Sequence, residues 1–129
     1  MNNKILLVTA LFFSLFIFSC ASVQGGDSSN PAGIYAGVIP AADCPGISVV
    51  VILNKNGTYK ITYQYIDRGD SLFTYTGSYK WDASSKIVTL DGRELPAYYR
   101  LGRQSLTQLD IEGKDIKSEF AKMYILRKI

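Results

Sequence analysis

Polar and apolar residues alternate with a period of two over two long stretches of this chain, 58–66 and 72–81. In the first, TYKITYQYI, tyrosine and isoleucine side chains share one face, and Lys60, Thr62 and Gln64 share the other. In the second, LFTYTGSYKW, aromatic residues again share one face, with Gly77 where a barrel strand can bend sharply. A period of two is typical of a strand with one buried face, so both stretches are predicted to be β-strands.

Shorter runs with strand-like composition occupy most of the remaining chain. Residues 47–53, ISVVVIL, are almost continuously β-branched, and the following NKNG is a strong hairpin signal because Asn and Gly accept a positive φ. We expect further strands at 34–39, 86–90, 95–101, 105–111 and 120–127, with room for one helical turn in 112–119. About eight short strands predict an all-β fold, a sandwich or a barrel, and sequential hairpins favour an antiparallel up-and-down meander closed into a β-barrel.

The first twenty residues have the layout of a secretory signal. Lys4 precedes the uncharged apolar run 5–18, which is too short to span about 30 Å of hydrocarbon as a helix. The run ends in IFSC, which resembles a bacterial lipobox. We therefore expect a lipoprotein signal peptide at 1–19, lipid attachment at Cys20, a Ser/Gly-rich tether at 20–32 and a folded domain at 33–129.

Two other interpretations of the N-terminus remain open: an ordinary signal peptide cut slightly later, and an uncleaved N-terminal anchor. In the lipoprotein interpretation, Ala21 rather than aspartate follows Cys20, which by resemblance to enteric lipoproteins favours the outer membrane. We expect a cell-envelope protein that faces the periplasm and contacts the membrane through its N-terminal lipid.

Composition narrows the possible chemistry. The net charge of +3 is scattered, without the basic stripe that a phosphate backbone requires, so nucleic acid is not an expected partner. The chain has no histidine, which removes the commonest general base and the commonest ligand of borderline metals. Its aspartates lie mostly in turns, where they cap backbone groups. We expect no enzymatic activity, no cofactor and no strong metal site.

The shared aromatic face of the two alternating stretches has two interpretations. It forms part of an ordinary core, because paired strands share one buried face, or it lines a cavity that binds a small apolar ligand. The candidate lining residues are Tyr59, Tyr63, Tyr65, Phe73, Tyr75, Tyr79 and Trp81.

Cys44 is the only cysteine of the predicted folded domain. If Cys20 carries lipid, no partner remains for an intrachain disulfide. The adjacent Asp43 disfavours a thiolate, and Pro45 and Gly46 predict a turn before the strand at 47–53. We expect Cys44 to be a partly buried structural residue.

Several segments together resemble the NlpE N-terminal domain family of outer-membrane lipoproteins. They are GVIPAADCPGI, LNKNGTY, YTGSYKWD, YYRLGRQSLTQLD and EGKDI, and they cover the chain from about residue 33 to 116. The resemblance implies a lipocalin-like β-barrel, non-enzymatic, linked to copper tolerance, surface contact and envelope-stress signalling. The motif residues it transfers are Pro40, Asp43, Cys44 and Gly46.

Two departures from the family pattern limit what is transferred. The family motif commonly has a Cys-x-x-Cys pair, but Ala41 stands in place of the first cysteine. We also expect the second, disulfide-containing domain of the best-known member to be absent. The sequence thus predicts an envelope lipoprotein whose barrel is a binding or sensing module for an unknown envelope protein; the alternative is a carrier of a small apolar ligand.

Overall fold

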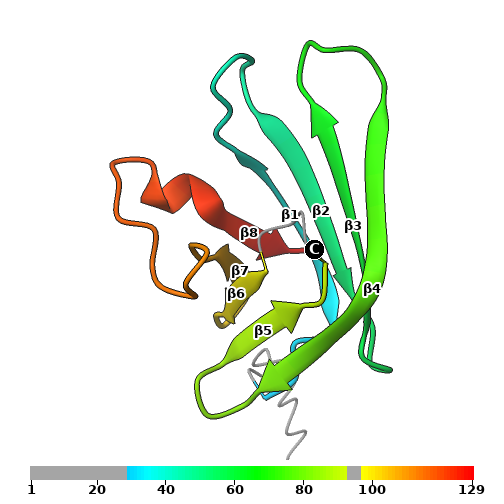
Figure 1. The fold of residues 1–129 in the computed structure, drawn as a ribbon, viewed down its shortest axis with the longest axis vertical. Coiled ribbons are helices and arrows are strands. Elements are labelled where there is room, and N and C mark those ends of the chain that lie inside the picture. Colours follow the sequence, from blue (N-terminus) through cyan, green and yellow to red (C-terminus); the bar gives the residue numbers. More distant parts are fainter. Residues whose placement is uncertain (1–28, 93–96) are drawn as a thin grey trace, which may run out of the picture.

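The computed structural model describes residues 29–92 and 97–129, which form one closed antiparallel β-barrel (Figure 1). Each strand pairs with the next along the chain, and the last strand pairs with the first, which confirms the predicted up-and-down barrel. The strands are β1 (Gly33–Ile39), β2 (Ile47–Leu53), β3 (Thr58–Tyr65), β4 (Leu72–Asp82), β5 (Ile87–Leu90), β6 (Tyr98–Leu101), β7 (Ser105–Gln108) and β8 (Ile125–Lys128), with a 3₁₀ helix η1 (Ala121–Tyr124) before β8.

The core lies inside the barrel, on the face that the alternating pattern predicts. Tyr35 of β1 stands opposite Val51 of β2, which stands opposite Ile61 of β3, and all three are almost completely buried. Strands β5 to β8 close the core from the other side with Val88, Tyr99, Leu101, Leu106 and Leu126. Burial of these side chains is the main stabilising contribution, at about 25 cal/mol for each Å² of apolar surface.

Two glycines explain local features of the long strands. Gly57 has φ +84°, and its N–H donates to Asn54 O (3.1 Å), so the NKNG segment forms the predicted hairpin. At Gly77 the lack of a side chain permits a close approach of other groups: a Cβ here would lie 2.8 Å from Cε1 of Tyr59 and would overlap the Asp91 carboxylate.

The predicted strand at 120–127 is wrong in its first half, because Ala121–Tyr124 form η1. Strand β7 ends at Gln108, and its pairing with β8 begins at Ile125, so residues 121–124 have no neighbouring β7 strand. Their backbone bonds locally instead, with Met123 N–H donating to Phe120 O at 2.8 Å. The expected helical turn therefore lies just after 112–119, not within it.

The predicted strand at 105–111 is too long, because β7 ends at Gln108 and the chain then turns. Asp110 accepts hydrogen bonds at Oδ1 from the N–H groups of Glu112 (2.8 Å) and Lys114 (2.9 Å), which turns the chain. In the predicted strand 95–101, the observed strand begins at Tyr98, and residues 95 and 96 lie outside the described part of the chain.

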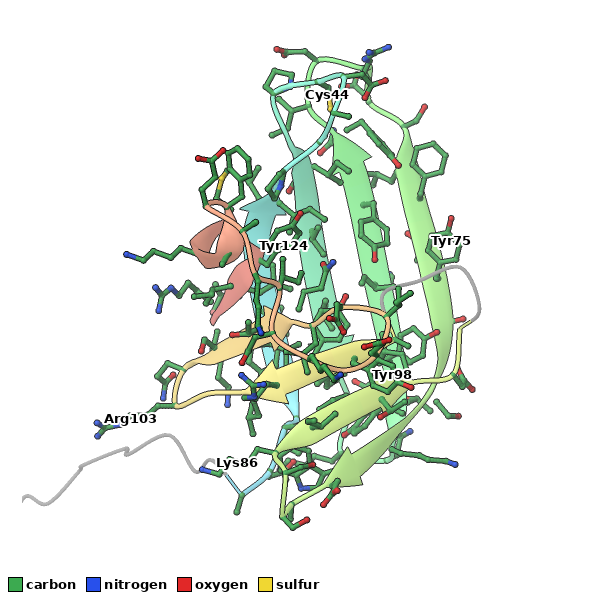
Figure 2. The ribbon with its side chains drawn as sticks, turned by 60° about the vertical axis from the view of Figure 1, so that its left-hand side comes forward. Cys44, Tyr75, Lys86, Tyr98, Arg103 and Tyr124 are labelled. Carbon is green, nitrogen blue, oxygen red and sulfur yellow. The ribbon has the colours of Figure 1, made fainter. Side chains whose placement is uncertain are left out.

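The barrel has two unlike halves and two unlike ends. Strands β1 to β4 are long, whereas β5 to β8 have four residues each, so the long sheet extends beyond the short one (Figure 1). Connections 40–46, 66–71 and 109–124 lie toward one end, which we call the tip, as do the described residues 91–92 and 97 between β5 and β6. Connections 54–57, 83–86 and 102–104 lie at the other, the base; Figure 2 shows Cys44 at the tip and Lys86 and Arg103 at the base. Within the described residues, no helix is long and apolar enough to cross a membrane.

Candidate functional site

An open aromatic surface lies at the tip because β4 extends beyond the end of its neighbouring strand β5. Strand β5 pairs only with Tyr79–Asp82, so the first part of β4 is hydrogen-bonded to β3 alone. The register turns Phe73 and Tyr75 toward the barrel interior, yet they are 47% and 38% exposed, and Tyr65 of β3 is 40% exposed. We call Tyr65, Phe73 and Tyr75 the aromatic opening.

Edge-to-face contacts hold these rings in place. The Tyr65 and Phe73 rings lie 5.7 Å apart at 88°, and the Tyr63 and Tyr75 rings lie 6.1 Å apart at 71°. Such pairs contribute about 0.5–1.5 kcal/mol beyond their buried area. The aromatic opening is therefore an ordered apolar surface rather than a set of independent side chains.

Beneath the opening, Tyr63 and Tyr99 carry buried hydroxyl groups that make no hydrogen bond of ordinary geometry in the described part of the chain, although the two phenols lie near each other. Burial raises the pKa of Tyr63 to about 12, and it raises the pKa of Tyr99 well above its ordinary value. The two phenols lie close enough that each influences the ionisation of the other. Tyr99 carries no periodic signal strong enough for the sequence to identify it, because its strand has only four residues.

Alkaline pH is expected to destabilise the barrel through these buried phenols. Because the pKa of Tyr63 is higher in the folded state than the ordinary value of 10, stability is constant below about pH 9 and falls as the pH rises from 10 toward 12. The slope is about 1.4 kcal/mol per pH unit for each such proton. Urea unfolding between pH 8 and 11.5 measures it; Tyr63→Phe should reduce the slope, and an unchanged slope in that variant would contradict the assignment.

The loop that contains Cys44 is fastened to the next tip loop. Arg68 Nη2 donates to Asp43 O (2.6 Å) and lies 3.2 Å from Asp43 Oδ2. Ile66 N–H donates to Gly46 O at 3.0 Å, and a Cβ at Gly46 would approach Val38 Cγ1 to 2.6 Å. Sequence reasoning missed Arg68 because it is 25 residues from Asp43, and only the side-by-side packing of the two hairpins brings them together.

Cys44 itself is half-buried and is a free thiol, and its Sγ donates to Gly46 O at 3.2 Å. Pro40, at the start of the same loop, is half-buried, and Ala41 follows it. Within residues 29–92 and 97–129, no group of three or more His, Cys, Asp and Glu side chains could hold a metal ion. The thiol of Cys44 therefore contributes a hydrogen bond within its own loop.

Replacing Cys44 with serine is expected to change the free energy of unfolding by less than about 1 kcal/mol, because a hydroxyl can donate to the same carbonyl. Urea unfolding of the two proteins measures the difference. Titration with Cu(I) should show no tight stoichiometric binding to either protein. Tight binding that Cys44→Ser abolishes would contradict this structural role.

The other predicted lining residues lie deeper or at the base. Tyr59 is 3% exposed within the core, and Tyr79 and Trp81 are half-buried against it. At the base, Tyr79 Oη donates to Asn54 O (2.6 Å), and Trp81 Nε1 donates to Ser29 O (3.2 Å). The predicted stripe is thus continuous along the inner face, and its most exposed members lie at the tip. Its role as a ligand cavity stays a prediction. Cys20 lies outside the described residues.

The fold and its open end define a class: a small antiparallel β-barrel with exposed aromatic side chains at its tip. The family model of the NlpE N-terminal domain matches residues 35–119, and the chain belongs to that family. This confirms the resemblance seen in the sequence motifs.

Individual relatives agree with the family assignment. The lipoprotein NlpE of Escherichia coli K12 is 28% identical over 93% of this chain, and the 17 kDa lipoprotein of Treponema pallidum is 26% identical over 84%. The match spans 56% of the length of the Escherichia coli protein and 76% of the Treponema protein.

Solved crystal structures also resemble the barrel, two of them from Shewanella oneidensis and Escherichia coli. One is of a candidate lipoprotein from Shewanella oneidensis, with 32% identity, TM-score 0.66 and coverage of 75% of this chain and 87% of that one. The other is of NlpE, the Cpx pathway activator from Escherichia coli, with 32% identity, TM-score 0.58 and coverage of 68% and 47%.

Proposed function

We propose that this protein is a cell-envelope lipoprotein whose barrel is a non-enzymatic binding and sensing module, anchored through Cys20 in the outer membrane and facing the periplasm. Its role would lie in envelope stress, surface sensing or copper tolerance. The name of the Escherichia coli relative as a Cpx pathway activator supports a signalling role. The absence of histidine from the whole sequence supports a non-enzymatic module.

The observation that carries the proposal is the exposure of the aromatic opening. Tyr65, Phe73 and Tyr75 turn toward the barrel interior, where their equivalents on the base half are covered, and yet each is more than a third exposed. Aromatic side chains gathered on an ordered surface are typical of the centre of a protein-binding site. An envelope protein with an apolar projection would bury the aromatic side chains that β5 to β8 leave exposed.

The proposal is tested in bacteria that produce this chain, with an envelope-stress reporter and survival in copper as readouts. Phe73→Ser with Tyr75→Ser should reduce the response to that of a strain without the protein. The matched control is Leu72→Ser with Thr76→Ser, because these neighbouring residues are also exposed on β4 but face outward. Equal responses from both double variants, at equal protein levels, would contradict the aromatic opening as the binding site.

A second candidate function is the carriage of a small apolar ligand at the same opening. The unpartnered buried hydroxyls of Tyr63 and Tyr99 favour it, because a ligand with a polar head could satisfy them. Native mass spectrometry of protein purified from the envelope discriminates the two functions. A co-purifying small molecule that Tyr75→Ser removes would support the carrier, and its absence would support the protein-binding module.

A further inference from the structure

Charge is distributed unequally between the two ends of the barrel. Each of the three base connections carries one cation and no carboxylate: Lys55 in 54–57, Lys86 in 83–86 and Arg103 in 102–104. Figure 2 shows Lys86 and Arg103 extending from the base, away from Cys44 at the tip. Antiparallel topology places alternate connections at the same end, so these cations share one surface.

Further cations border this surface. Lys80 near the end of β4 and Arg127 and Lys128 at the end of β8 are exposed. Asp82, two residues after Lys80, accepts hydrogen bonds from Ser84 and Ser85, which hold its pKa below the ordinary value. We call Lys55, Lys80, Lys86, Arg103, Arg127 and Lys128 the basic surface.

The tip connections have the opposite character. Among the described residues of these connections, acidic side chains outnumber basic ones. The basic residues are Arg68, Lys114, Lys117 and Lys122. The acidic residues are Asp43, Asp67, Asp70, Asp91, Asp110, Glu112, Asp115 and Glu119. All three ion pairs found among the described residues involve a tip carboxylate: Asp43–Arg68, Asp115–Arg100 and Glu112–Lys114. The basic surface makes no ion pair within the same part of the chain.

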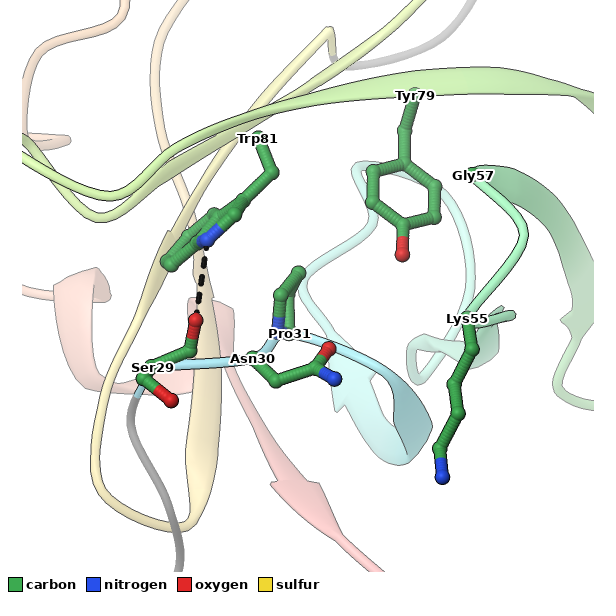
Figure 3. A pocket seen from close by; sticks show the side chains of 7 residues that line it. All are labelled: Ser29, Asn30, Pro31, Lys55, Gly57, Tyr79 and Trp81. Atoms are coloured by element: carbon green, nitrogen blue, oxygen red, sulfur yellow. Dashed lines mark hydrogen bonds between the residues drawn. The ribbon is translucent and has the colours of Figure 1, made fainter.

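The N-terminal segment enters the barrel at the base. Tyr35 Oη donates to Pro31 O (2.8 Å), and Trp81 Nε1 donates to Ser29 O (3.2 Å), so residues 29–31 are held against the end of the barrel (Figure 3). They line a pocket of about 530 Å³ together with Lys55, Tyr79 and Trp81. The described chain therefore starts beside the basic surface and at the end opposite to the aromatic opening.

Chain length restricts how far the base can lie from a lipid on Cys20. Nine residue steps separate Cys20 from Ser29, and a fully extended chain of that length spans only about 30 Å. The base is consequently the end of the barrel that the anchor holds near the membrane surface.

We propose that the basic surface binds anionic lipid headgroups and orients the barrel with its aromatic opening away from the membrane. This inference rests on the lipid anchor of the proposed function. Each Lys or Arg at an anionic membrane contributes about a five-fold increase in membrane association. Trp81 lies at this end, where indole rings of membrane-bound proteins commonly contact headgroups. A partner would then reach the opening from the periplasm without obstruction by the bilayer.

Trp81, the only tryptophan of the chain, reports the orientation directly. The full acylated protein is reconstituted into vesicles of phosphatidylethanolamine with or without phosphatidylglycerol, together with a lipid whose headgroup carries a nitroxide quencher. Quenching of Trp81 fluorescence is expected in the anionic vesicles at low salt. It should fall in 0.5 M salt and in vesicles without phosphatidylglycerol, because the contact is electrostatic.

Matched charge reversals locate the contact. The base variant is Lys55→Glu, Lys80→Glu and Arg103→Glu, and the control is Lys114→Glu, Lys117→Glu and Lys122→Glu, which changes the net charge equally with exposed tip residues. Lys86 is kept because its φ is +58°. The base variant should lower the ratio of docked to undocked barrel about 100-fold or more, and the control should retain most of the quenching.

The two proposals fail in different ways. Mass spectrometry that finds no acyl group on Cys20 would contradict both the anchor and the orientation. An acylated protein whose Trp81 is quenched equally in the base variant and the control, or equally in both kinds of vesicle, would contradict the basic surface alone.

Discussion

Replacing Cys20 with serine is expected to transfer the protein from the membrane fraction to the soluble fraction. The thiol of Cys20 is the proposed acceptor of the lipid, and serine cannot form the thioether. Acyl chains contribute about 0.8 kcal/mol for each buried methylene, so their loss removes nearly all of the membrane affinity. The basic surface alone should give only weak, salt-sensitive association. Fractionation of cells followed by mass spectrometry of the N-terminal peptide measures the change.

Cys44 provides the matched control, because it is the only other cysteine of the chain. Cys44→Ser should remain in the membrane fraction with its acyl group intact. If Cys20→Ser also stays membrane-bound in high salt, and no acyl group is found at position 20 in the unaltered protein, the lipoprotein assignment is wrong. An uncleaved N-terminal anchor would then be the interpretation that fits the apolar run 5–18.

Replacing Tyr99 with alanine is expected to destabilise the barrel by about 3–5 kcal/mol. Tyr99 lies on β6, which pairs with β5 and β7, and its side chain is completely buried in the main core cluster. Removing it leaves a cavity that the closed barrel cannot collapse to fill. Since small domains have about 5–15 kcal/mol of stability in total, the variant should be largely unfolded at elevated temperature.

Tyr99→Phe is the informative partner of this variant. It keeps the ring and removes a hydroxyl that is buried without a hydrogen-bond partner. We expect the free energy of unfolding to stay the same or rise by about 1 kcal/mol, because an unsatisfied buried polar group costs stability. Denaturant unfolding of the three proteins gives both values. A loss of about 1 kcal/mol or more in Tyr99→Phe would mean that the hydroxyl is hydrogen-bonded in solution.

The sequence alone predicted the fold class and most of the strands. Alternation in β3 and β4 identified the inward face correctly, since a pleated strand must turn every second side chain to the same side. The NKNG hairpin followed from the ability of Gly57 to adopt a positive φ. These features are local, so residues close in sequence determine them. The family motifs could be recognised from the sequence because each is a short contiguous segment.

The tertiary structure decided which part of the predicted aromatic stripe is open. Tyr59 and Phe73 occupy equivalent inward positions on paired strands, but Tyr59 is 3% exposed and Phe73 is 47% exposed. Periodicity cannot separate them, because exposure depends on where β5 stops pairing with β4. That limit is set by strands 87–90 and 98–101, which are distant in sequence from Phe73.

The separation of charge between the two ends of the barrel also depends on the tertiary structure. The sequence shows scattered charges, and only the alternation of connections between tip and base collects Lys55, Lys86 and Arg103 on one surface. Arg68 likewise meets Asp43 only because two hairpins pack side by side. The backbone pattern of most segments was thus determined locally by their own residues, whereas residues 121–124 form η1 because β7 ends before it reaches them. The surfaces that could bind a partner or a membrane were determined by how the closed barrel brings separate segments together.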